Sequence, residues 1–368
     1  KYHGLYFMEI NNILVFNPFG IGDVLFATPL IRNLKEKFPL ARIYFICNRR
    51  VYPITKRNKF LYKVIVFEKD EWKGVLRKSK LEFFKKIFSF GNEIKKCKFD
   101  IMFDLSMNSQ YGFFFKMLGI KKRIGFNFKN RGRFLTHKID IIDGYNKKHV
   151  ARYCLELLKF LNMSPKDYKF DLFLNESDLE VSKNILKKYE YKKNKKALVG
   201  ICPGSGDSWQ DTAYFKRWPK ENFIRLIDML SEKQEVNIIL FGSKGERDVC
   251  EHIYDNVKQK ILNLCGKLNL EEFCGIVSLC DIIISNDGGS FHIAQALGKK
   301  TFVFFGPVDE KVYGPYPDES IGTVFKKDLS CRPCYNAFKF KGCLLDKKCL
   351  RSINSEEVFG LIKNEFLT

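Results

Sequence analysis

The feature that most constrains the fold is a short apolar run that ends in a glycine-containing turn and leads into a helical pattern. In the N-terminal half, residues 13–16 form an apolar run with β-branched members, and the turn 17–23 follows it. Residues 24–38 then carry apolar side chains at helical spacing, and another apolar run covers 41–47. This order predicts a strand–loop–helix–strand unit whose loop lies at the carboxyl end of the first strand.

The C-terminal half opens with the same pattern. An apolar run over 197–202 precedes the glycine-containing turn 203–207, and apolar runs then alternate with helical patterns. We expect an α/β chain with two Rossmann-like, doubly wound domains, whose ligands bind at the carboxyl ends of the strands. The other predicted strands cover 63–67, 101–105, 237–241, 281–285 and 301–305, and the helices of the second series cover 219–231, 245–257, 269–279 and 290–298.

A chain of 368 residues is long enough for two domains. A stretch rich in Lys, Asn, Asp and Tyr after residue 162 predicts a linker with a helix near 176–188. Met8 stands just before the first apolar run and is a candidate natural start. We expect a basic N-terminal domain over 1–165, a linker region over 166–196, a C-terminal domain over 197–350 and a C-terminal helix over 351–368.

The net charge of +22 is concentrated in the N-terminal half. Residues 1–165 hold 33 Lys and Arg against 13 Asp and Glu, whereas residues 166–368 hold 31 against 29. A basic half predicts an anionic partner, such as nucleic acid, membrane phosphate or an acidic glycan. Lys, Ile, Asn and Phe are all abundant, so codon bias stays an alternative source of part of the excess.

The compartment is predicted from what the sequence lacks. No apolar run approaches the roughly 18–20 residues of a membrane-spanning helix, so we expect no membrane crossing. Residues 1–7 are too short and too mixed for the core of a signal peptide. We therefore expect the twelve cysteines to be mostly reduced thiols, and the cytoplasm is the default compartment.

Residues 75–98 combine Leu, Ile and Phe with seven lysines. This composition is typical of a basic amphipathic helix, which could lie on a membrane surface. The alternative is an ordinary surface helix with an apolar inner face, and the sequence leaves both open.

The first polar cluster is Gly20-Ile21-Gly22-Asp23, at the start of a predicted helix. Glycines allow a tight turn and a close approach of the backbone to a ligand. Asp23 could project as a general base, or it could cap the helix.

A second cluster predicts an anion site in the C-terminal half. The loop 203–206 offers backbone amides, and Lys216 supplies a cation at some distance from it. Amides beside a cation are what a pyrophosphate needs. The chain has no G-x-x-x-x-G-K-[ST] pattern, so a P-loop is excluded.

The third cluster, 285–292, is the densest in polar residues. It follows a predicted strand and precedes a predicted helix, so Gly288 and Gly289 would present amides at a helix N-terminus. Asp287 would project beside them and could hold sugar hydroxyls. The alternative is an Asp cap with a packed His292.

Together, the three clusters resemble glycosyltransferase family 9, the ADP-heptose:lipopolysaccharide heptosyltransferases and their relatives. The match runs in order over roughly residues 12–315. The residues that carry it are Gly20 to Leu25 with Thr28-Pro29, Lys216-Arg217-Trp218-Pro219, Asn286-Asp287-Gly288-Gly289 with His292, Ala294 and Ala296-Leu297-Gly298, and Phe305-Gly306-Pro307.

This resemblance implies a GT-B fold, with the acceptor on the N-terminal domain and a nucleotide sugar on the C-terminal domain. It implies an inverting transfer that needs no cofactor, in which Asp23, on the acceptor-side loop with Gly20 and Gly22, takes the acceptor hydroxyl's proton. The implied donor-binding residues are Ser205, Lys216, Gly288 and Gly289 for the diphosphate, Glu246 for the ribose, Leu268 for the adenine, Asp287 for the donor sugar and His292 as support for that loop.

Two positions depart from the family's pattern. Asn17 stands where many members carry a basic residue, and Gly288 stands where Ser or Thr is usual. A hydroxyl at 288 would be one more contact to the donor, so the resemblance leaves the identity of the donor sugar open.

Four cysteines gather near the C-terminus, within the segment 331–349. Thiolates at such spacings suit tetrahedral zinc, although the spacing is not that of a CxxC…CxxC pair. Some members of the family carry a similar Cys-rich segment. A structural zinc site, disulfides and free thiols all stay open for Cys331, Cys334, Cys343 and Cys349.

These observations favour a cytoplasmic enzyme, peripheral on the inner membrane, that transfers heptose from ADP-heptose to a lipopolysaccharide core or a related lipid-linked glycan. We expect an anionic membrane surface as a partner, and no nucleic acid, because no nucleic-acid-binding signature is present. The alternatives are a GT-B transferase with another nucleotide sugar, and a non-catalytic glycan- or nucleic-acid-binding protein.

Overall fold

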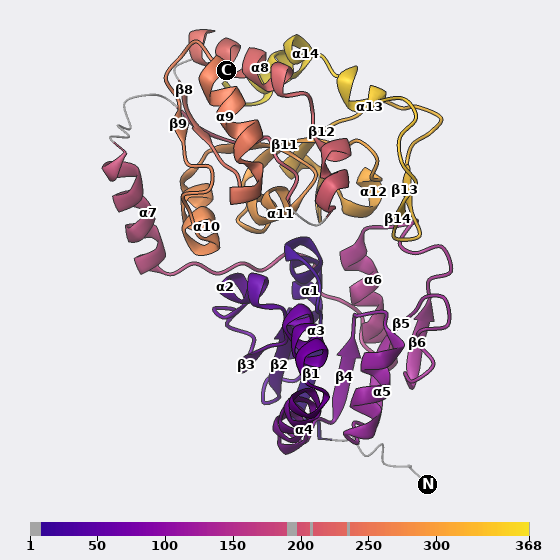
Figure 1. Cartoon of the computed structure of the whole chain (residues 1–368). Coiled ribbons are helices and arrows are strands. Elements are labelled where there is room, and N and C mark those ends of the chain that lie inside the picture. The colour runs from indigo at the N-terminus through magenta and orange to yellow at the C-terminus, as the bar shows by residue number, and fades with distance from the viewer. Residues whose placement is uncertain (1–8, 190–196, 207–208, 234–235, 368) are drawn as a thin grey trace. The chain divides into compact units, whose positions relative to one another are not determined.

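Both predicted series of strands form parallel sheets in the computed structural model of the chain (Figure 1). Met8, the candidate natural start, and residues 190–196 of the predicted linker lie outside the described residues. The structure describes residues 9–189, 197–206, 209–233 and 236–367.

The chain forms two units, and it passes between them more than once. Unit 1 comprises Lys1–Ile142 and Ala151–Tyr168, and unit 2 comprises Asp143–Val150 and Lys169–Thr368. The segment Asp143–Val150 therefore belongs to unit 2, although the chain returns to unit 1 after it. Composition does not predict that a segment inside the N-terminal half belongs to unit 2, because membership of a unit depends on the contacts that the segment makes.

The sheet of unit 1 has six parallel strands in the order β3-β2-β1-β4-β5-β6. This is the strand order of a Rossmann fold. The strands are β1 (Asn12–Phe16), β2 (Arg42–Cys47), β3 (Lys63–Val66), β4 (Ile101–Asp104), β5 (Lys122–Asn127) and β6 (His137–Asp140), and the helices are α1 (Ile21–Lys37), α2 (Tyr52–Thr55), α3 (Lys69–Lys78), α4 (Lys80–Lys96), α5 (Ser109–Met117) and α6 (Val150–Glu156).

The main sheet of unit 2 repeats that order from β7 onward, as β9-β8-β7-β10-β11-β12. A small antiparallel hairpin, β13 (Tyr335–Asn336) and β14 (Lys339–Phe340), lies in the Cys-rich segment. The other elements are β7 (Ala197–Cys202), β8 (Val236–Leu240), β9 (Leu262–Asn263), β10 (Ile282–Asn286), β11 (Lys300–Phe304), β12 (Gly322–Phe325), α7 (Glu176–Lys188), α8 (Lys220–Lys233), α9 (Arg247–Asn256), α10 (Leu270–Leu279), α11 (Gly289–Ala296), α12 (Glu310–Tyr313), α13 (Lys348–Arg351) and α14 (Ser355–Ile362).

The strand order places the predicted polar clusters at the topological switch point of each sheet, where the order of the strands reverses. In unit 1 this point lies between β1 and β4, and the glycine-containing loop follows β1. In unit 2 it lies between β7 and β10, and loops 203–206 and 287–288 follow those strands. Ligands of open α/β sheets bind at this crevice.

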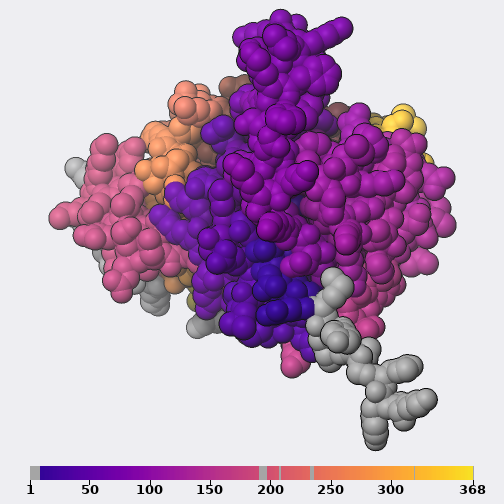
Figure 2. All heavy atoms as spheres, turned by 90° about the horizontal axis from the view of Figure 1, so that it is seen from below, coloured from indigo at the N-terminus to yellow at the C-terminus, as the bar shows by residue number. Residues whose placement is uncertain are grey.

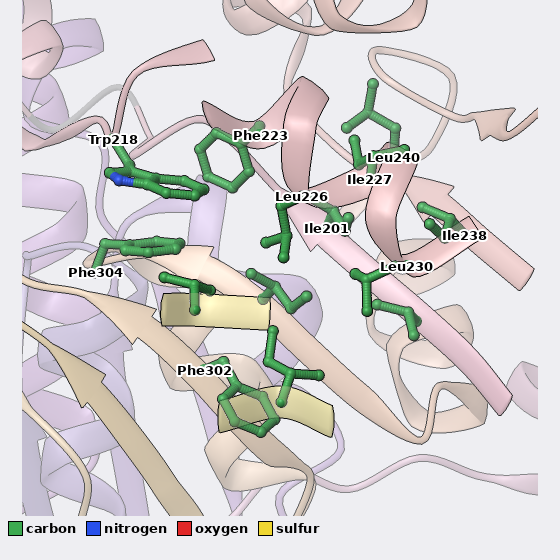
Figure 3. Packing of buried hydrophobic residues seen from close by; sticks show 14 of the residues in the cluster. Ile201, Trp218, Phe223, Leu226, Ile227, Leu230, Ile238, Leu240, Phe302 and Phe304 are labelled. Atoms are coloured by element: carbon green, nitrogen blue, oxygen red, sulfur yellow. The ribbon is translucent and has the colours of Figure 1, made fainter. Parts of the chain in front are cut away.

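A core of apolar side chains packs against one face of the unit 2 sheet. Trp218 stacks on Phe304 of β11, with ring centres 4.2 Å apart and planes at 13°. Figure 3 shows apolar side chains of α8, among them Leu226 and Leu230, packed over strand residues such as Ile201. The same layer includes residues of α14, so the C-terminal helix closes this face of the sheet.

Two predictions about secondary structure are corrected. The single helix expected over 75–98 is two helices, α3 and α4, because Ser79 ends one and caps the other by accepting a hydrogen bond from Glu82 N at 3.2 Å. The sequence also did not predict β5, β6, β9 and β12, which are short or carry charged residues. The predicted helix near 176–188 is confirmed as α7.

Within the described part of the chain, no helix has the length and apolarity needed to cross a bilayer. All twelve cysteines fall within the described residues, and each is a free thiol.

Candidate functional site

The loop between β1 and α1 and the first turn of α1 place Gly20, Gly22 and Asp23 at the carboxyl end of the unit 1 sheet. Asn17 is 2% exposed and anchors this loop through its side-chain amide. Its Nδ2 donates to the Asp23 carbonyl oxygen at 2.9 Å, and its Oδ1 accepts from Phe19 N at 3.2 Å. A neutral amide at position 17 therefore sets the path of the backbone that precedes Asp23.

Asp23 is not the N-cap of α1, so the capping alternative for this residue is wrong. The N-cap is Gly20, and Asp23 is half-buried in the first helical turn, where the helix N-terminus favours an anion. Arg50 lies near the same loop. A Cβ added at Gly20 would be 3.9 Å from both Arg50 Nη2 and Asp23 Oδ2, which is ordinary van der Waals contact, so position 20 borders the space between this guanidinium and the carboxylate.

The helix behind this loop continues through Pro29. Proline has no N–H, so the Leu25 carbonyl lacks its normal helical donor. Thr28 Oγ1 donates to that carbonyl at 2.7 Å, and Asn33 Nδ2 donates to the Pro29 carbonyl at 2.8 Å. The Thr-Pro pair thus leaves α1 intact as the support of the glycine-containing loop.

In unit 2, one buried amide joins the loops that carry the predicted residues. Asn286 ends β10 and is 0% exposed. Its Nδ2 donates to the carbonyl oxygens of Pro203 at 2.7 Å and Gly204 at 3.1 Å. Its Oδ1 accepts from Trp218 N at 2.8 Å. These bonds tie the loop after β7 and the segment that follows Lys216 to the end of β10.

Lys216 and Asp287 form a buried ion pair beside this amide. Lys216 Nζ is 2.7 Å from Asp287 Oδ2, and the two side chains are 7% and 6% exposed. The ammonium also lies 5.0 Å from the centre of the Trp209 ring, which is cation–π geometry.

His292 lies against the same pair, with its Nε2 4.0 Å from Asp287 Oδ1. Burial lowers the pKa of His292 to about 4, although the Asp287 charge opposes that shift. The ring is therefore neutral at neutral pH, and its role beside Asp287 is that of a packed neutral group.

The first turn of α11 adds backbone donors to this cluster. Gly288 is the N-cap of the helix and Gly289 is its first residue. An ammonium and a helix N-terminus are typical of a phosphate site, and the neighbouring Asp287 carboxylate can accept from hydroxyl groups. This combination suits a ligand that carries both a phosphate and a sugar.

Glu246 has a structural task that the sequence did not predict. It is 6% exposed, its Oε1 accepts from Gly206 N at 2.8 Å, and its Oε2 accepts from Ser243 N at 2.8 Å. A Cβ added at Gly204 would meet Oε1 at 1.8 Å, so only glycine fits there. Glu246 thus joins the loop after β8 to the loop after β7.

Ser205 explains why glycine stands at position 288. The Ser205 Oγ donates to the Ala213 carbonyl at 3.0 Å. Its own carbonyl oxygen lies 2.8 Å from the place that a Cβ at Gly288 would take, which is too close for a side chain without a shift of the loop. Leu268, the last of the predicted residues, is half-buried between β9 and α10.

The Cys-rich segment 331–349 packs against the same part of unit 2. Arg332 Nε donates to the Gly306 carbonyl at 2.5 Å. Lys347 is 4% exposed, and its Nζ donates to the Arg217 carbonyl at 3.2 Å. The segment therefore covers the Lys-Arg-Trp-Pro element that presents Lys216.

The structure gives no support to the zinc site or to the disulfides that the cysteines suggested. Cys331, Cys334, Cys343 and Cys349 are free thiols whose environments range from exposed to buried. Among the residues that the structure describes, no three His, Cys, Asp or Glu side chains gather so that they could hold a metal ion. The segment is held by the contacts of Arg332 and Lys347 instead.

The sequence assigned no role to two asparagines that organise these loops. Asn286 entered only as part of the family motif. Asn48, which directly follows β2, was not singled out, and its Nδ2 donates to the Phe19 carbonyl at 2.5 Å while its Oδ1 accepts from Val51 N at 3.2 Å. The sequence pattern that could have identified them is an Asn at the end of a buried apolar strand and near a glycine-containing loop. A buried side-chain amide there needs hydrogen-bond partners, and the loop backbone supplies them.

Replacing Asn286 by Ala should loosen this cluster. The change removes three hydrogen bonds and leaves buried backbone groups unpaired, so we expect the free energy of unfolding to fall by about 3 kcal/mol. Denaturant unfolding followed by circular dichroism measures the loss. Asn222→Ala, which removes one bond to the Ile353 carbonyl, is the matched control and should cost about 1 kcal/mol. Equal unfolding midpoints for Asn286→Ala and the native chain would contradict this role.

Acid should destabilise the fold through His292. Its pKa is about 4 in the folded chain against an ordinary 6.5, so the unfolded chain binds the proton first as pH falls. The stability contributed by the neutral ring is present above pH 6.5 and is lost toward pH 4, by about 3 kcal/mol in total.

The comparison of the native chain with His292→Gln isolates this effect. The buried Asp104, whose pKa is raised by burial to about 6, opposes it in part of the same window and is unchanged in both proteins. We expect the unfolding free energy of the native chain, taken relative to that of the variant, to fall by about 3 kcal/mol as the pH decreases from 6.5 to 4. Parallel curves would show that His292 does not titrate with unfolding.

With the geometry established, comparisons with known proteins identify the family. The model of glycosyltransferase family 9 (heptosyltransferase) matches residues 87–344. The chain is 26% identical over 360 residues to lipooligosaccharide heptosyltransferase 2 of Campylobacter jejuni, and the alignment covers 96% of this chain and 97% of that protein.

Solved structures show the same fold. A family 9 glycosyltransferase from Veillonella parvula superposes with a TM-score of 0.80 at 20% identity, covering 98% of this chain and 99% of that one. The ADP-heptose LPS heptosyltransferase II of Escherichia coli has a TM-score of 0.75 at 18% identity, covering 97% and 98%. The predicted GT-B fold is confirmed. Since the family model matches more than half of the chain, the chain belongs to glycosyltransferase family 9, the heptosyltransferase family, and is a glycosyltransferase.

Proposed function

We propose that this glycosyltransferase moves heptose from ADP-heptose to a lipopolysaccharide or lipooligosaccharide core, with inversion at the anomeric carbon. The observation that carries the proposal is the buried Lys216–Asp287 pair at the N-terminus of α11. The relatives support it by name, since one is a lipooligosaccharide heptosyltransferase and another an ADP-heptose LPS heptosyltransferase.

In this proposal the diphosphate of the donor binds to the positive groups of the cluster. The Lys216 ammonium has three protons, and its ion pair with Asp287 engages at most one of them. The others are available to phosphate oxygens, together with the amides of Gly288 and Gly289 and the hydroxyl of Ser205. Charge on the departing diphosphate is thereby neutralised.

The rest of the donor is assigned to three neighbouring residues. Glu246 keeps lone pairs beyond its two backbone bonds and can accept from ribose hydroxyls. Leu268 offers an apolar contact to the adenine. Asp287 accepts from hydroxyls of the donor sugar, and the neutral His292 packs beside it.

Asp23 of unit 1 is the proposed general base. The acceptor hydroxyl gives its proton to the Asp23 carboxylate while its oxygen attacks the anomeric carbon. On the opposite face of that carbon, the bond to the diphosphate oxygen breaks, and its electron pair leaves with ADP. The anomeric configuration is inverted, and the chemistry needs no cofactor.

The charge of the N-terminal half suits the proposed acceptor. Residues 1–165 hold 33 Lys and Arg against 13 Asp and Glu, and a core glycan of this type is acidic and lipid-linked. Such an acceptor places the enzyme on the cytoplasmic side of the inner membrane, as a peripheral protein.

A different nucleotide sugar is the second candidate donor, and Gly288 is the observation that favours it. The Ser205 carbonyl leaves no room for a side chain at this position. A donor that depends on a hydroxyl at 288 would therefore be bound less well than one that does not.

Replacing Asp23 by Asn should abolish most of the transfer and leave donor binding intact. Asn has nearly the same shape but cannot take a proton, and loss of a general base costs about 10²–10⁴-fold in rate. Turnover is followed as ADP release in the presence of acceptor, and donor affinity by calorimetry. Asp70→Asn makes the same chemical change at an exposed aspartate of α3 and is the control. Turnover of Asp23→Asn within a few-fold of the native rate would remove Asp23 as the base.

Lys216 should decide affinity for the diphosphate. Removing one charged partner alone would leave Asp287 buried and unpaired, so the test uses Lys216→Met together with Asp287→Asn. We expect ADP to bind about 10–100-fold more weakly, as loss of charge-assisted hydrogen bonds implies, with a smaller effect on AMP.

A thermal-shift panel of nucleotides and nucleotide sugars compares the ADP affinity of the native chain with that of the double variant, and it also identifies the donor. With the native chain, ADP-heptose should raise Tm more than other nucleotide sugars do, and the double variant should lose most of the shift given by ADP. A larger shift from another nucleotide sugar would replace heptose as the donor sugar. Equal ADP affinities of the native chain and the double variant would refute the role of Lys216.

A further inference from the structure

The hairpin of α3 and α4 in unit 1 has a face that the fold leaves uncovered. Every residue of α3 is at least partly exposed, and the buried residues of α4 are Gly91 and Ile94, near its C-terminal end. In Figure 2 the purple atoms of this hairpin project from the surface of the unit.

The inner side of the hairpin is held by aromatic rings around Trp72. Its ring centre lies 6.3 Å from that of Phe83 and 5.3 Å from that of Phe90, both on α4. It also lies 5.0 Å from Phe67, which belongs to the core of unit 1. The attachment of the hairpin therefore uses one side of α4.

The opposite side of α4 carries Leu81, Phe84 and Phe88, which we term the α4 stripe. The spacing of three and four residues puts them on one helix face. They are 65%, 64% and 72% exposed, and Leu76 of α3 is 42% exposed. Single exposed apolar side chains are ordinary, but three on one face of a projecting helix indicate a surface that a partner covers.

The hairpin that carries this stripe is rich in cations. Residues 69–98 hold ten Lys and Arg against four Asp and Glu. Arg77, Lys78 and Lys80 are exposed at the junction of the two helices. Lys86 instead pairs with Glu71 and lies over the Trp72 ring, on the inner side. The exposed side of the hairpin is thus both apolar and positively charged.

We propose that the α4 stripe, with Arg77, Lys78 and Lys80, docks unit 1 on an anionic lipid bilayer. Such a bilayer matches both properties, because its acyl region accepts Leu and Phe while its phosphates attract Lys and Arg. A second copy of this chain matches less well, since two basic surfaces repel each other. The inference rests on the proposed function in one respect, that a lipid-linked acceptor lies in such a bilayer.

Binding of the full chain to vesicles tests this surface. Vesicles of phosphatidylglycerol with phosphatidylethanolamine should bind the protein in a salt-sensitive manner, and vesicles of phosphatidylcholine should not. The triple variants Leu81→Gln/Phe84→Gln/Phe88→Gln and Arg77→Gln/Lys78→Gln/Lys80→Gln should each bind at least about tenfold more weakly in co-sedimentation. All six side chains are exposed, so the variants should keep the native Tm.

Matched controls change similar groups elsewhere. Leu40→Gln alters an apolar side chain of unit 1 that is 89% exposed. The triple variant Lys183→Gln/Lys187→Gln/Lys188→Gln removes three exposed cations from α7. Both controls should bind vesicles as the native chain does.

Native-like vesicle binding by the stripe variant would overturn the proposal. So would a dimer that the stripe variant abolishes in light scattering, because a second copy would then cover this face. Transfer to a water-soluble, deacylated acceptor should be unchanged in the stripe variant. If the native chain itself fails to transfer heptose, the proposed function falls, whereas the vesicle result still decides the docking surface.

Discussion

The side-chain amide of Asn286 is the interaction on which the candidate site of unit 2 depends. It holds the end of β10 against the loop after β7 and against the segment that follows Lys216. Because the amide is wholly buried, its two donors and its acceptor must all be satisfied, and these bonds allow one arrangement of the three segments. Ser205 lies in the loop after β7, Lys216 directly precedes the Trp218 segment, and Asp287 directly follows β10, so the amide fixes the neighbourhood of three residues assigned to the donor.

The hydrogen bonds of Asn286 hold the Lys216–Asp287 pair in the place where it can bind a phosphate. A buried charge is costly unless it is paired, and here the ammonium is paired with a carboxylate and lies over the Trp209 ring. Since the loops hold the ammonium in place before any ligand binds, little reorganisation is needed when a phosphate arrives. The Cys-rich segment contributes by covering the Lys-Arg-Trp-Pro element, which is a packing role for a segment that suggested a metal.

Much of the fold could be predicted because its signals are local. The apolar run 197–202 and the helix near 176–188 have the bounds that their patterns indicate. The sequence did not predict β5 and β6, because these strands carry charged residues. It did not predict the helix break at Ser79, because the apolar spacing continues across it. Asp23 is not the N-cap because the helix begins two residues before it, at Ile21, with Gly20 as its N-cap.

The sequence by itself determined the alternation of the buried strands, glycine-containing loops and helices along the chain, and hence which loops follow the strands that carry the polar clusters. It also determined the family and the concentration of positive charge in residues 1–165. Only the tertiary structure decided that Asn286 bonds to Pro203, that the Ser205 carbonyl excludes a side chain at Gly288, and that Leu81, Phe84 and Phe88 face outward. These contacts join segments far apart in the chain or depend on which helix face is covered, and local spacing carries neither kind of information.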